Sequence, residues 1–161
     1  MTRDLFRSQL ASYAAVHRDR RNKATHFVGI PVIVFSLLLL LTLWHAALPV
    51  AILAVVGWLA LDLGIGLVMA VLMAAGWAAA EALAGRLGTP TAVWTAFGVL
   101  FVGGWILQFL GHHYEGRRPA LLDNIFQAFI GPMFLVAEAL VALGHRPDLA
   151  RAMGEHGVTA R

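Results

Sequence analysis

The sequence predicts an all-α protein: a polytopic integral membrane bundle of four to five apolar helices, preceded by an amphipathic N-terminal helix. Of its 161 residues, 60% are hydrophobic and the mean hydropathy is +0.75, whereas soluble domains contain roughly 45–50% apolar residues. Several apolar runs approach the roughly 20 residues that a helix needs to cross a bilayer. A soluble, alanine-rich bundle is the alternative, but a domain of this size keeps too much of its surface in water to use so many apolar residues.

The length predicts one domain, residues 1–161, with three parts. Residues 1–26 form the amphipathic helix and a basic segment, residues 27–143 form the membrane bundle, and residues 144–161 form a polar, exposed tail. The chain has no cysteine, which excludes a disulfide framework and a thiolate metal site.

The first helix is predicted over residues 3–17 from apolar side chains at i, i+4, i+7 and i+11. This stripe consists of Phe6, Leu10, Tyr13 and His17. Because the arginines mostly lie elsewhere, the helix is expected to lie on the membrane surface. His17 ends the stripe and therefore points where the stripe points.

The basic residues gather near the N-terminus, and the net charge is +3. Those that precede the first apolar run are Arg3, Arg7, Arg18, Arg20, Arg21 and Lys23. The positive-inside rule then predicts a cytoplasmic N-terminus. Nucleic-acid binding is the other interpretation of a basic arm, and it is disfavoured because this arm is short and leads directly into a membrane segment.

Four spans are predicted: Phe27 to Trp44, about Pro49 to Leu61, a third from the break at Asp62 to about Leu83, and Thr91 to Leu110. Pro31 is expected in the first turns of the first span, where a missing N–H costs least. A fifth apolar segment, residues 125–143, is interrupted by polar residues, glycine and proline; it either spans, re-enters, or packs against the other helices. Tryptophans near the span ends are expected as interfacial anchors: Trp44, Trp58 and Trp94.

An even number of spans returns the chain to its starting side. Two polar clusters, HRDRRNKATH (His17 to His26) and HHYEGRR (His112 to Arg118), therefore lie at the same membrane face. His45 falls on the opposite face, and His145 and His156 lie in or beside the tail, so these three are expected to be peripheral.

His17 and His26 are nine residues apart and would face opposite ways on one straight helix. A break between them is required if both bind one ion. The run from Arg18 to Asn22 supplies such a break, with Asn22 capping the next helix and sharing a face with His26. The alternative is two unrelated interfacial histidines among arginines that bind lipid headgroups.

His112 and Glu115 have i, i+3 spacing and can face one centre, whereas His113 points elsewhere on a continuous helix. Two or three imidazoles with a carboxylate and open positions suit a non-haem Fe(II) that activates O₂, and the same set could hold Zn²⁺. Glu115 could instead orient a ligating histidine. The alternative for the histidine pair is a helix C-terminus that favours cationic side chains.

Charged groups flank or interrupt the apolar segments. Arg117 and Arg118 could hold the carboxylate of an acidic lipid substrate or satisfy phospholipid phosphates. Asp62, Glu81 and Glu138 lie in or near apolar segments, where ionisable groups are functional by default. Asp62 is also placed to cap a helix, and Glu138 to support the site or the packing.

Two segments together resemble the 2-hydroxy fatty acid dioxygenase family: YAAVHRDRRNKATHFVGIPVIVFS (Tyr13 to Ser36) and WILQFLGHHYEGRRPALLDNIFQAFIGPMFLVAE (Trp105 to Glu138). The order, spacing and chain length match, while the region from Trp44 to Trp94 matches only in being apolar. The resemblance implies an Fe(II) cofactor held by His17, His26 and His112, with His113 as a further metal-ligand candidate.

The implied reaction converts a long-chain 2-hydroxy fatty acid to the acid one carbon shorter plus CO₂, with O₂ as co-substrate. It releases four electrons, and one O₂ takes up four, so no external reductant is needed. On this interpretation Glu115 and Asn22 are catalytic, and the substrate is bound by Arg117, Arg118, Tyr13 and Asn124. The protein is expected in the bacterial inner membrane, or the endoplasmic reticulum if eukaryotic, with its metal site on the cytoplasmic side.

Three other functions are weighed against this one. Di-iron fatty acid hydroxylases and desaturases need about eight histidines in HxxxH and HxxHH boxes, and this chain has seven histidines and neither box. A non-enzymatic lipid-binding or transport protein would bind no metal tightly. A zinc-dependent membrane hydrolase would act without O₂.

Overall fold

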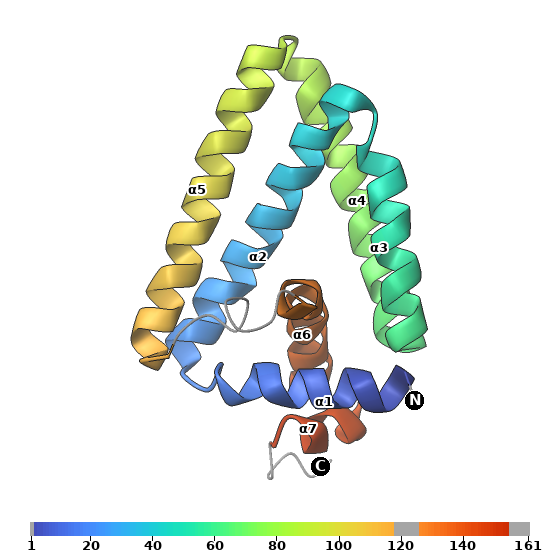
Figure 1. Ribbon diagram of the computed structural model, residues 1–161, viewed down its shortest axis with the longest axis vertical. Coiled ribbons are helices and arrows are strands. Elements are labelled where there is room, and N and C mark those ends of the chain that lie inside the picture. The colour runs from blue at the N-terminus through green and yellow to red at the C-terminus, as the bar shows by residue number, and fades with distance from the viewer. Residues whose placement is uncertain (1, 118–125, 155–161) are drawn as a thin grey trace.

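The computed structural model describes residues 2–117 and 126–154, which form helices and no strand (Figure 1). The elements are α1 (Thr2–Ala15), α2 (Arg20–Leu41), the 3₁₀ turn η1 (Thr42–Trp44), α3 (Ala47–Leu61), α4 (Leu63–Leu87), α5 (Pro90–Glu115), α6 (Phe126–Ala142) and α7 (Pro147–Ala152). The predicted all-α class is confirmed.

Two pairs of long helices form the frame of the bundle. α2 packs along α5 in the most extensive helix–helix contact of the fold, and α3 packs along α4. The pairs meet at one end, near η1, and diverge toward the other, where α6 lies between them (Figure 1). α1 crosses this wider end, with α7 beneath it. The start of α2 and the end of α5 therefore lie at the same end of the bundle, because the chain runs back and forth along it four times, in α2, α3, α4 and α5.

Three segments are long and apolar enough to cross a membrane: Arg20–Trp44, Leu63–Leu87 and Pro90–Glu115. At 1.5 Å per residue, a helix of 25 residues exceeds the roughly 30 Å hydrocarbon core. Their outward side chains are apolar; Val71, for example, is 70% exposed and Val99 69% exposed. The second predicted span corresponds to α3, an apolar helix of 15 residues that is shorter than these three. The protein is thus an all-α membrane bundle.

The break between α1 and α2 differs in detail from the prediction. Asp19, not Asn22, caps α2: its carboxylate accepts the Arg21 N–H at 2.8 Å. Asn22 is the third residue of the helix, within its first turn, and is fully buried. Because α2 begins at Arg20, Pro31 lies in the middle of the helix instead of in its first turns. The sequence located the break, but it did not show which of several capping residues would be used.

Asp62 ends α3 and caps α4, accepting the Ile65 N–H at 2.9 Å. It also receives two hydrogen bonds from the Arg146 guanidinium, at 2.9 and 2.8 Å. This ion pair draws the segment after α6 back to the bundle, and Leu149 of α7 is fully buried. The prediction of an exposed tail from residue 144 is therefore wrong for α7.

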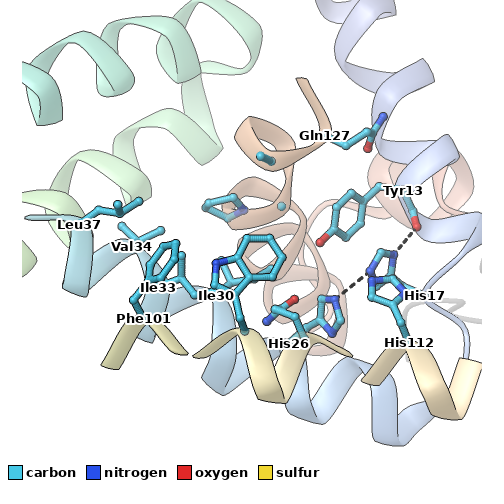
Figure 2. A pocket seen from close by; sticks show the side chains of 15 residues that line it. Tyr13, His17, His26, Ile30, Ile33, Val34, Leu37, Phe101, His112 and Gln127 are labelled. Carbon is cyan, nitrogen blue, oxygen red and sulfur yellow. Dashed lines mark hydrogen bonds between the residues drawn. The ribbon is translucent and has the colours of Figure 1, made fainter. Parts of the chain in front are cut away.

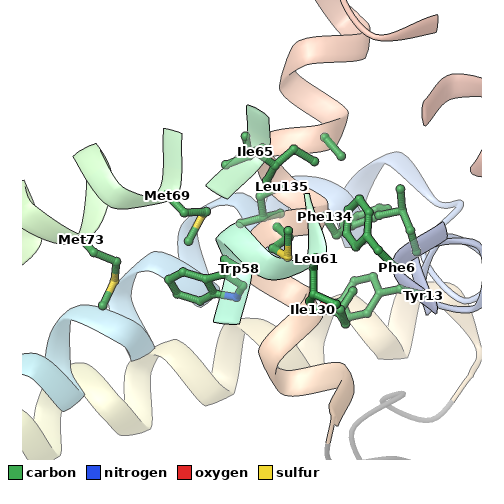
Figure 3. Packing of buried hydrophobic residues seen from close by; sticks show 14 of the residues in the cluster. Phe6, Tyr13, Trp58, Leu61, Ile65, Met69, Met73, Ile130, Phe134 and Leu135 are labelled. Atoms are coloured by element: carbon green, nitrogen blue, oxygen red, sulfur yellow. The ribbon is translucent and has the colours of Figure 1, made fainter. Parts of the chain in front are cut away.

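The core lies where α1, α3, α4 and α6 meet (Figure 3). The predicted stripe of α1 faces it, since Phe6, Leu10 and Tyr13 are all buried. α6 contributes Ile130 and Phe134, so the fifth apolar segment packs within the protein. Trp44 and Trp94 are exposed near the ends of their helices, as interfacial anchors are expected to be, and their rings meet edge to face.

Trp58 departs from the prediction of an interfacial anchor. It is buried, stacks on Phe129 and donates its indole N–H to the Phe129 carbonyl at 2.9 Å. Trp58 thus joins α3 to α6 inside the protein. An indole near a span end can serve either role, and only the position of α6 decides between them.

Candidate metal centre

Glycines bring α2 and α5 close together. A Cβ on Gly111 would lie 2.5 Å from Asn22 Oδ1 and 3.0 Å from His26 Nδ1, and it would also overlap Thr25 Oγ1. A Cβ on Gly104 would lie 2.6 Å from Ile33 Cγ1. Because glycine has no side chain, the backbones of α2 and α5 can approach closely at Gly111 and at Gly104. The approach at Gly111 places His26 on α2 beside His112 on α5.

Three histidines converge at this crossing. His17, His26 and His112 are all buried, and one nitrogen from each imidazole lies within 4.8 Å of the others. Their ring centroids are 4.6 to 5.0 Å apart. His17 comes from the break after α1, so segments from both ends of the chain supply the cluster.

Hydrogen bonds fix the orientation of two of the rings. His17 Nδ1–H donates to the Tyr13 carbonyl at 2.7 Å, and His26 Nδ1–H donates to the Asn22 carbonyl at 2.9 Å. A carbonyl only accepts, so in both neutral rings the proton is on Nδ1 and Nε2 carries a lone pair. These two Nε2 atoms face each other at 3.1 Å. Neither can donate to the other in this tautomer, so the pair needs a positive charge between or beside it.

A divalent metal ion satisfies this requirement. With metal–nitrogen bonds of roughly 2.0–2.1 Å, as for zinc, a single ion would be within reach of both imidazoles, whose Nε2 atoms are 3.1 Å apart. The Nδ1 atom of His112 is buried and has no hydrogen-bond partner in the described chain. Ligating histidines commonly donate their other ring N–H to a carbonyl, which is the arrangement of His17 and His26. The donor set thus fits a metal centre.

Burial favours the neutral form of His17, which is the form that can bind a cation. It lowers the pKa of His17 to about 4, so the ring is neutral at pH 7. The Tyr13 ring stacks on the imidazole, with centroids 4.0 Å apart and planes 3° from parallel. Burial also raises the pKa of the Tyr13 hydroxyl, which therefore remains protonated and can donate a hydrogen bond.

Glu115 supports the cluster from outside. Its carboxylate accepts the backbone N–H groups of Arg18, at 3.0 Å, and Asp19, at 2.8 Å, and the side-chain amide of Asn22, at 3.0 Å. These bonds tie the break before α2 to the end of α5. Gly116, with φ of 67°, ends α5 immediately afterwards. Glu115 is therefore placed to orient the segment that carries His17, which is the second of the two roles left open by the sequence.

Asn22 links Glu115 to His26. It receives the His26 Nδ1–H on its carbonyl and donates its side-chain amide to Glu115. The neighbouring residue Lys23 forms an ion pair with Glu138, at 2.6 Å, which joins α2 to α6. Glu138 thus has the packing role that the sequence left open.

A cavity of about 350 Å³ opens beside the histidines (Figure 2). His17, His26 and His112 lie at one end, where the Tyr13 hydroxyl points inward. The other end is apolar, lined from α2 and α5 by Ile30, Ile33, Val34, Leu37, Phe101 and Trp105. Such a shape suits a ligand with a polar head and a hydrocarbon chain.

Comparison with known proteins identifies the family of this chain. Residues 4–143 match the profile of a family described as 2-hydroxy-palmitic acid dioxygenase Mpo1-like. The chain is also similar to the 2-hydroxy-palmitic acid dioxygenase MPO1 of Saccharomyces cerevisiae, with 34% identity over 161 residues that cover 93% of this chain and 87% of the yeast protein. The chain belongs to the Mpo1-like family. No solved structure matches it. The predicted family resemblance is confirmed, and the matched residues include all three clustered histidines.

The remaining predicted residues of this Mpo1-like chain fall into four groups. Tyr13 lines the cavity. His113 and Arg117 are exposed at the end of α5 and do not line it, and His113 is not part of the histidine cluster. The substrate-binding predictions for Arg118 and Asn124 lie outside the described residues. His45, at the opposite end of the bundle, and His145 are exposed, as expected of peripheral residues.

Sequence reasoning missed two buried amides, Gln108 and Gln127, which also line the cavity. A signal for Gln108 was present: it is a polar residue inside the apolar span, four residues before His112 and therefore on the same helical face. Gln127 is one of the polar residues that interrupt the last apolar segment, and nothing in the sequence places it at the cavity.

Proposed function

We propose that this protein is an Fe(II)-dependent dioxygenase that converts long-chain 2-hydroxy fatty acids to the acid one carbon shorter and CO₂. The single observation that carries the proposal is the convergence of His17, His26 and His112 at the polar end of an apolar cavity. The yeast relative, which is named a 2-hydroxy-palmitic acid dioxygenase, supports the same substrate class.

The reaction balances with O₂ as the only oxidant. R–CH(OH)–COOH and O₂ give R–COOH, CO₂ and H₂O, as the C1–C2 bond is cleaved. The 2-hydroxy acid gives up four electrons and O₂ takes up four. This fits a chain in which the sequence shows no nucleotide-binding motif.

In this proposal His17, His26 and His112 hold the ion. Three imidazoles with open positions suit a non-haem Fe(II), which when bound activates O₂ toward the substrate. Tyr13 and Asn22 fix two of the imidazoles through their carbonyls. The walls from α2 and α5 hold the acyl chain and exclude water from the reacting carbons.

The orientation in the membrane is also part of the proposal. Three basic residues just before and at the start of α2 lie at the same end of the bundle as Arg117, which follows α5: Arg18, Arg20 and Arg21. The positive-inside rule places this end, and with it the histidine cluster, on the cytoplasmic side. The exposed Arg117 is then positioned to bind lipid phosphates.

The test is a single-turnover reaction of the purified protein. Protein loaded with Fe(II) under anaerobic conditions is given 2-hydroxypalmitate and then O₂, and mass spectrometry follows pentadecanoic acid. We expect about one product per iron and none before O₂ is admitted. Cleavage of an ester or amide lipid by zinc-loaded protein without O₂, with no pentadecanoic acid formed from 2-hydroxypalmitate, would support a hydrolase instead, and the absence both of bound metal and of product would support a lipid-binding protein.

A further inference from the structure

Gln108 is a buried amide that the metal centre does not use. It is 6% exposed, and its Nε2 has no hydrogen-bond partner in the described part of the chain. Buried donors are nearly always paired in native proteins, because an unpaired one loses its bonds to water without compensation. Since Gln108 lines the cavity, a bound ligand is the natural source of the missing acceptor.

The position of Gln108 along α5 suggests which part of a ligand it meets. His112, Gln108, Trp105 and Phe101 follow one another at spacings of four, three and four residues, so they form one stripe facing the cavity. Gln108 lies between the imidazole of His112 and the first apolar wall residue, Trp105. A fatty acid with its polar head at the histidines therefore has its head-to-chain boundary beside Gln108.

The α2–α5 crossing fixes the amide in place. A Cβ on Gly29 would overlap Gln108 Nε2 and would lie 3.0 Å from the Gly104 carbonyl oxygen. Gly29 thus makes room on α2 for the amide group of α5. The Gln108 amide therefore packs against the α2 backbone at Gly29.

Apart from the histidines, the other side-chain donors in the described lining are the Tyr13 hydroxyl, the Trp105 indole N–H and Gln127 Nε2, and Gln127 Nε2 already donates to Gln9. No lysine or arginine is among the described residues that line it. Arg117, predicted from the sequence to bind the substrate head, is exposed and lies outside the lining. A neutral amide N–H donates a directional hydrogen bond to a carboxylate oxygen.

The geometry points to Gln108 as the residue that hydrogen-bonds the carboxylate of the 2-hydroxy acid. This inference rests on the proposed function for the identity of the ligand, and it names the group that positions the substrate head. It predicts that the cavity recognises a carboxylate by a buried amide, without an arginine.

Binding of three ligands separates the possible roles of Gln108. 2-Hydroxypalmitate carries both polar groups, palmitate carries only the carboxylate, and 1-pentadecanol carries only the hydroxyl. Binding is measured by calorimetry on anaerobic Fe(II)-loaded protein in nanodiscs, so no turnover is needed. In Gln108→Leu we expect binding of both carboxylates to weaken by about 10- to 100-fold, as for loss of a hydrogen bond to a charged group, and binding of 1-pentadecanol to stay unchanged.

Gln127→Leu is the matched control. Gln127 is 5% exposed in the same cavity, but its Nε2 already donates to Gln9 and its unpartnered atom is the acceptor Oε1. We expect it to cause no loss selective for carboxylates. Gln108→Glu, which puts a negative charge at the same position, should weaken both carboxylates at least as much as Gln108→Leu does.

Several results would overturn the inference. Equal weakening of all three ligands in Gln108→Leu would mean a structural role, and weakening of only the hydroxyl-bearing ligands would assign Gln108 to the hydroxyl. Unchanged binding of all three would remove it from the site. Iron content and melting temperature of each variant confirm that it is folded. Failure of the proposed function appears separately, as a wild-type protein that binds these ligands but forms no pentadecanoic acid.

Discussion

His17 and His26 point their Nε2 atoms at each other across 3.1 Å, while each Nδ1–H is donated to a backbone carbonyl four residues earlier. Because the ring proton of each histidine is on Nδ1, both Nε2 atoms are hydrogen-bond acceptors. Two lone pairs at this distance in a buried site repel each other unless a cation lies with them. The arrangement therefore joins the local backbone geometry of α1 and α2 directly to metal binding.

The first prediction concerns the three proposed ligands. His17→Ala, His26→Ala and His112→Ala should each remove bound iron and turnover, with a loss of metal affinity larger than the roughly 10–100-fold that follows loss of a supporting partner. Metal analysis of the purified variants measures this. His45→Ala is the control, because His45 is exposed at the opposite end of the bundle. Wild-type iron content and activity in the His112 variant would refute the proposed centre.

Glu115 should affect the metal only through the segment that it holds. Glu115→Ala leaves the N–H groups of Arg18 and Asp19 without their acceptor, so we expect metal affinity to fall by roughly 10–100-fold without being abolished. Glu115→Gln keeps one acceptor oxygen and should lie between the alanine variant and wild type. Titration with Co(II), followed by its visible absorption, gives the affinities.

A control for Glu115 is available on α4. Glu81 is also a carboxylate near an apolar segment, but it is exposed and accepts the Trp77 indole N–H on its own helix. Glu81→Ala should bind Co(II) like wild type. Complete loss of metal in Glu115→Ala, equal to that of the histidine variants, would instead indicate that Glu115 is itself a ligand.

We expect the close packing of α2 against α5 to exclude residues larger than glycine at position 111. In Gly111→Ala the new Cβ would lie 2.5 Å from Asn22 Oδ1 and 3.0 Å from His26 Nδ1, so either the helices separate or these side chains move. Overpacking of this kind costs about 1–3 kcal/mol, and the displaced His26 should weaken metal binding. Thermal unfolding and Co(II) titration measure the two effects.

Gly103 provides the matched substitution on the same helix. A Cβ there meets nothing within 4 Å, and alanine is favoured over glycine inside a helix by up to about 1 kcal/mol. Gly103→Ala should therefore be neutral or stabilising and should keep the metal site. Equal destabilisation by both substitutions would show that the close approach at Gly111 is not required.

The elements of the fold were largely predictable because their signals are local. Apolar run length located the long helices, and the stripe from Phe6 to His17 correctly identified the buried face of α1. The break between His17 and His26 followed from requiring both to face one centre. The sequence did not show which residue caps α2, because Asp19 and Asn22 are both good capping residues. The choice between them depends on Glu115, which is far away in the chain.

What the sequence could not show is which polar groups face the cavity. Arg117 has the right chemistry for a carboxylate, but the left-handed residue Gly116 ends α5 just before it and Arg117 is exposed. Gln108 has weaker chemistry and the better position, because one helical turn separates it from His112. Likewise, Arg146 in the expected tail binds Asp62, 84 residues away, and no local pattern predicts such a pairing.

The Asp62–Arg146 pair should make stability depend on acid. Two hydrogen bonds from the Arg146 guanidinium, and a third from the Ile65 N–H, hold the pKa of Asp62 below its ordinary value. A folded-state pKa below the unfolded value, about 3.9, means that the unfolded state binds more protons in this range. The stabilisation is therefore fully present above about pH 4 and is lost as the pH falls through the folded-state pKa. Asp62→Asn should lower the free energy of unfolding at pH 7 by about 1–3 kcal/mol and flatten its decline below pH 4, as measured by unfolding in detergent across pH. Glu81→Gln, at an exposed carboxylate, is the control and should leave both the free energy of unfolding and its pH dependence unchanged. If the stability of Asp62→Asn fell with acid just as that of wild type does, the Asp62–Arg146 pair would not be what holds α7 to the bundle.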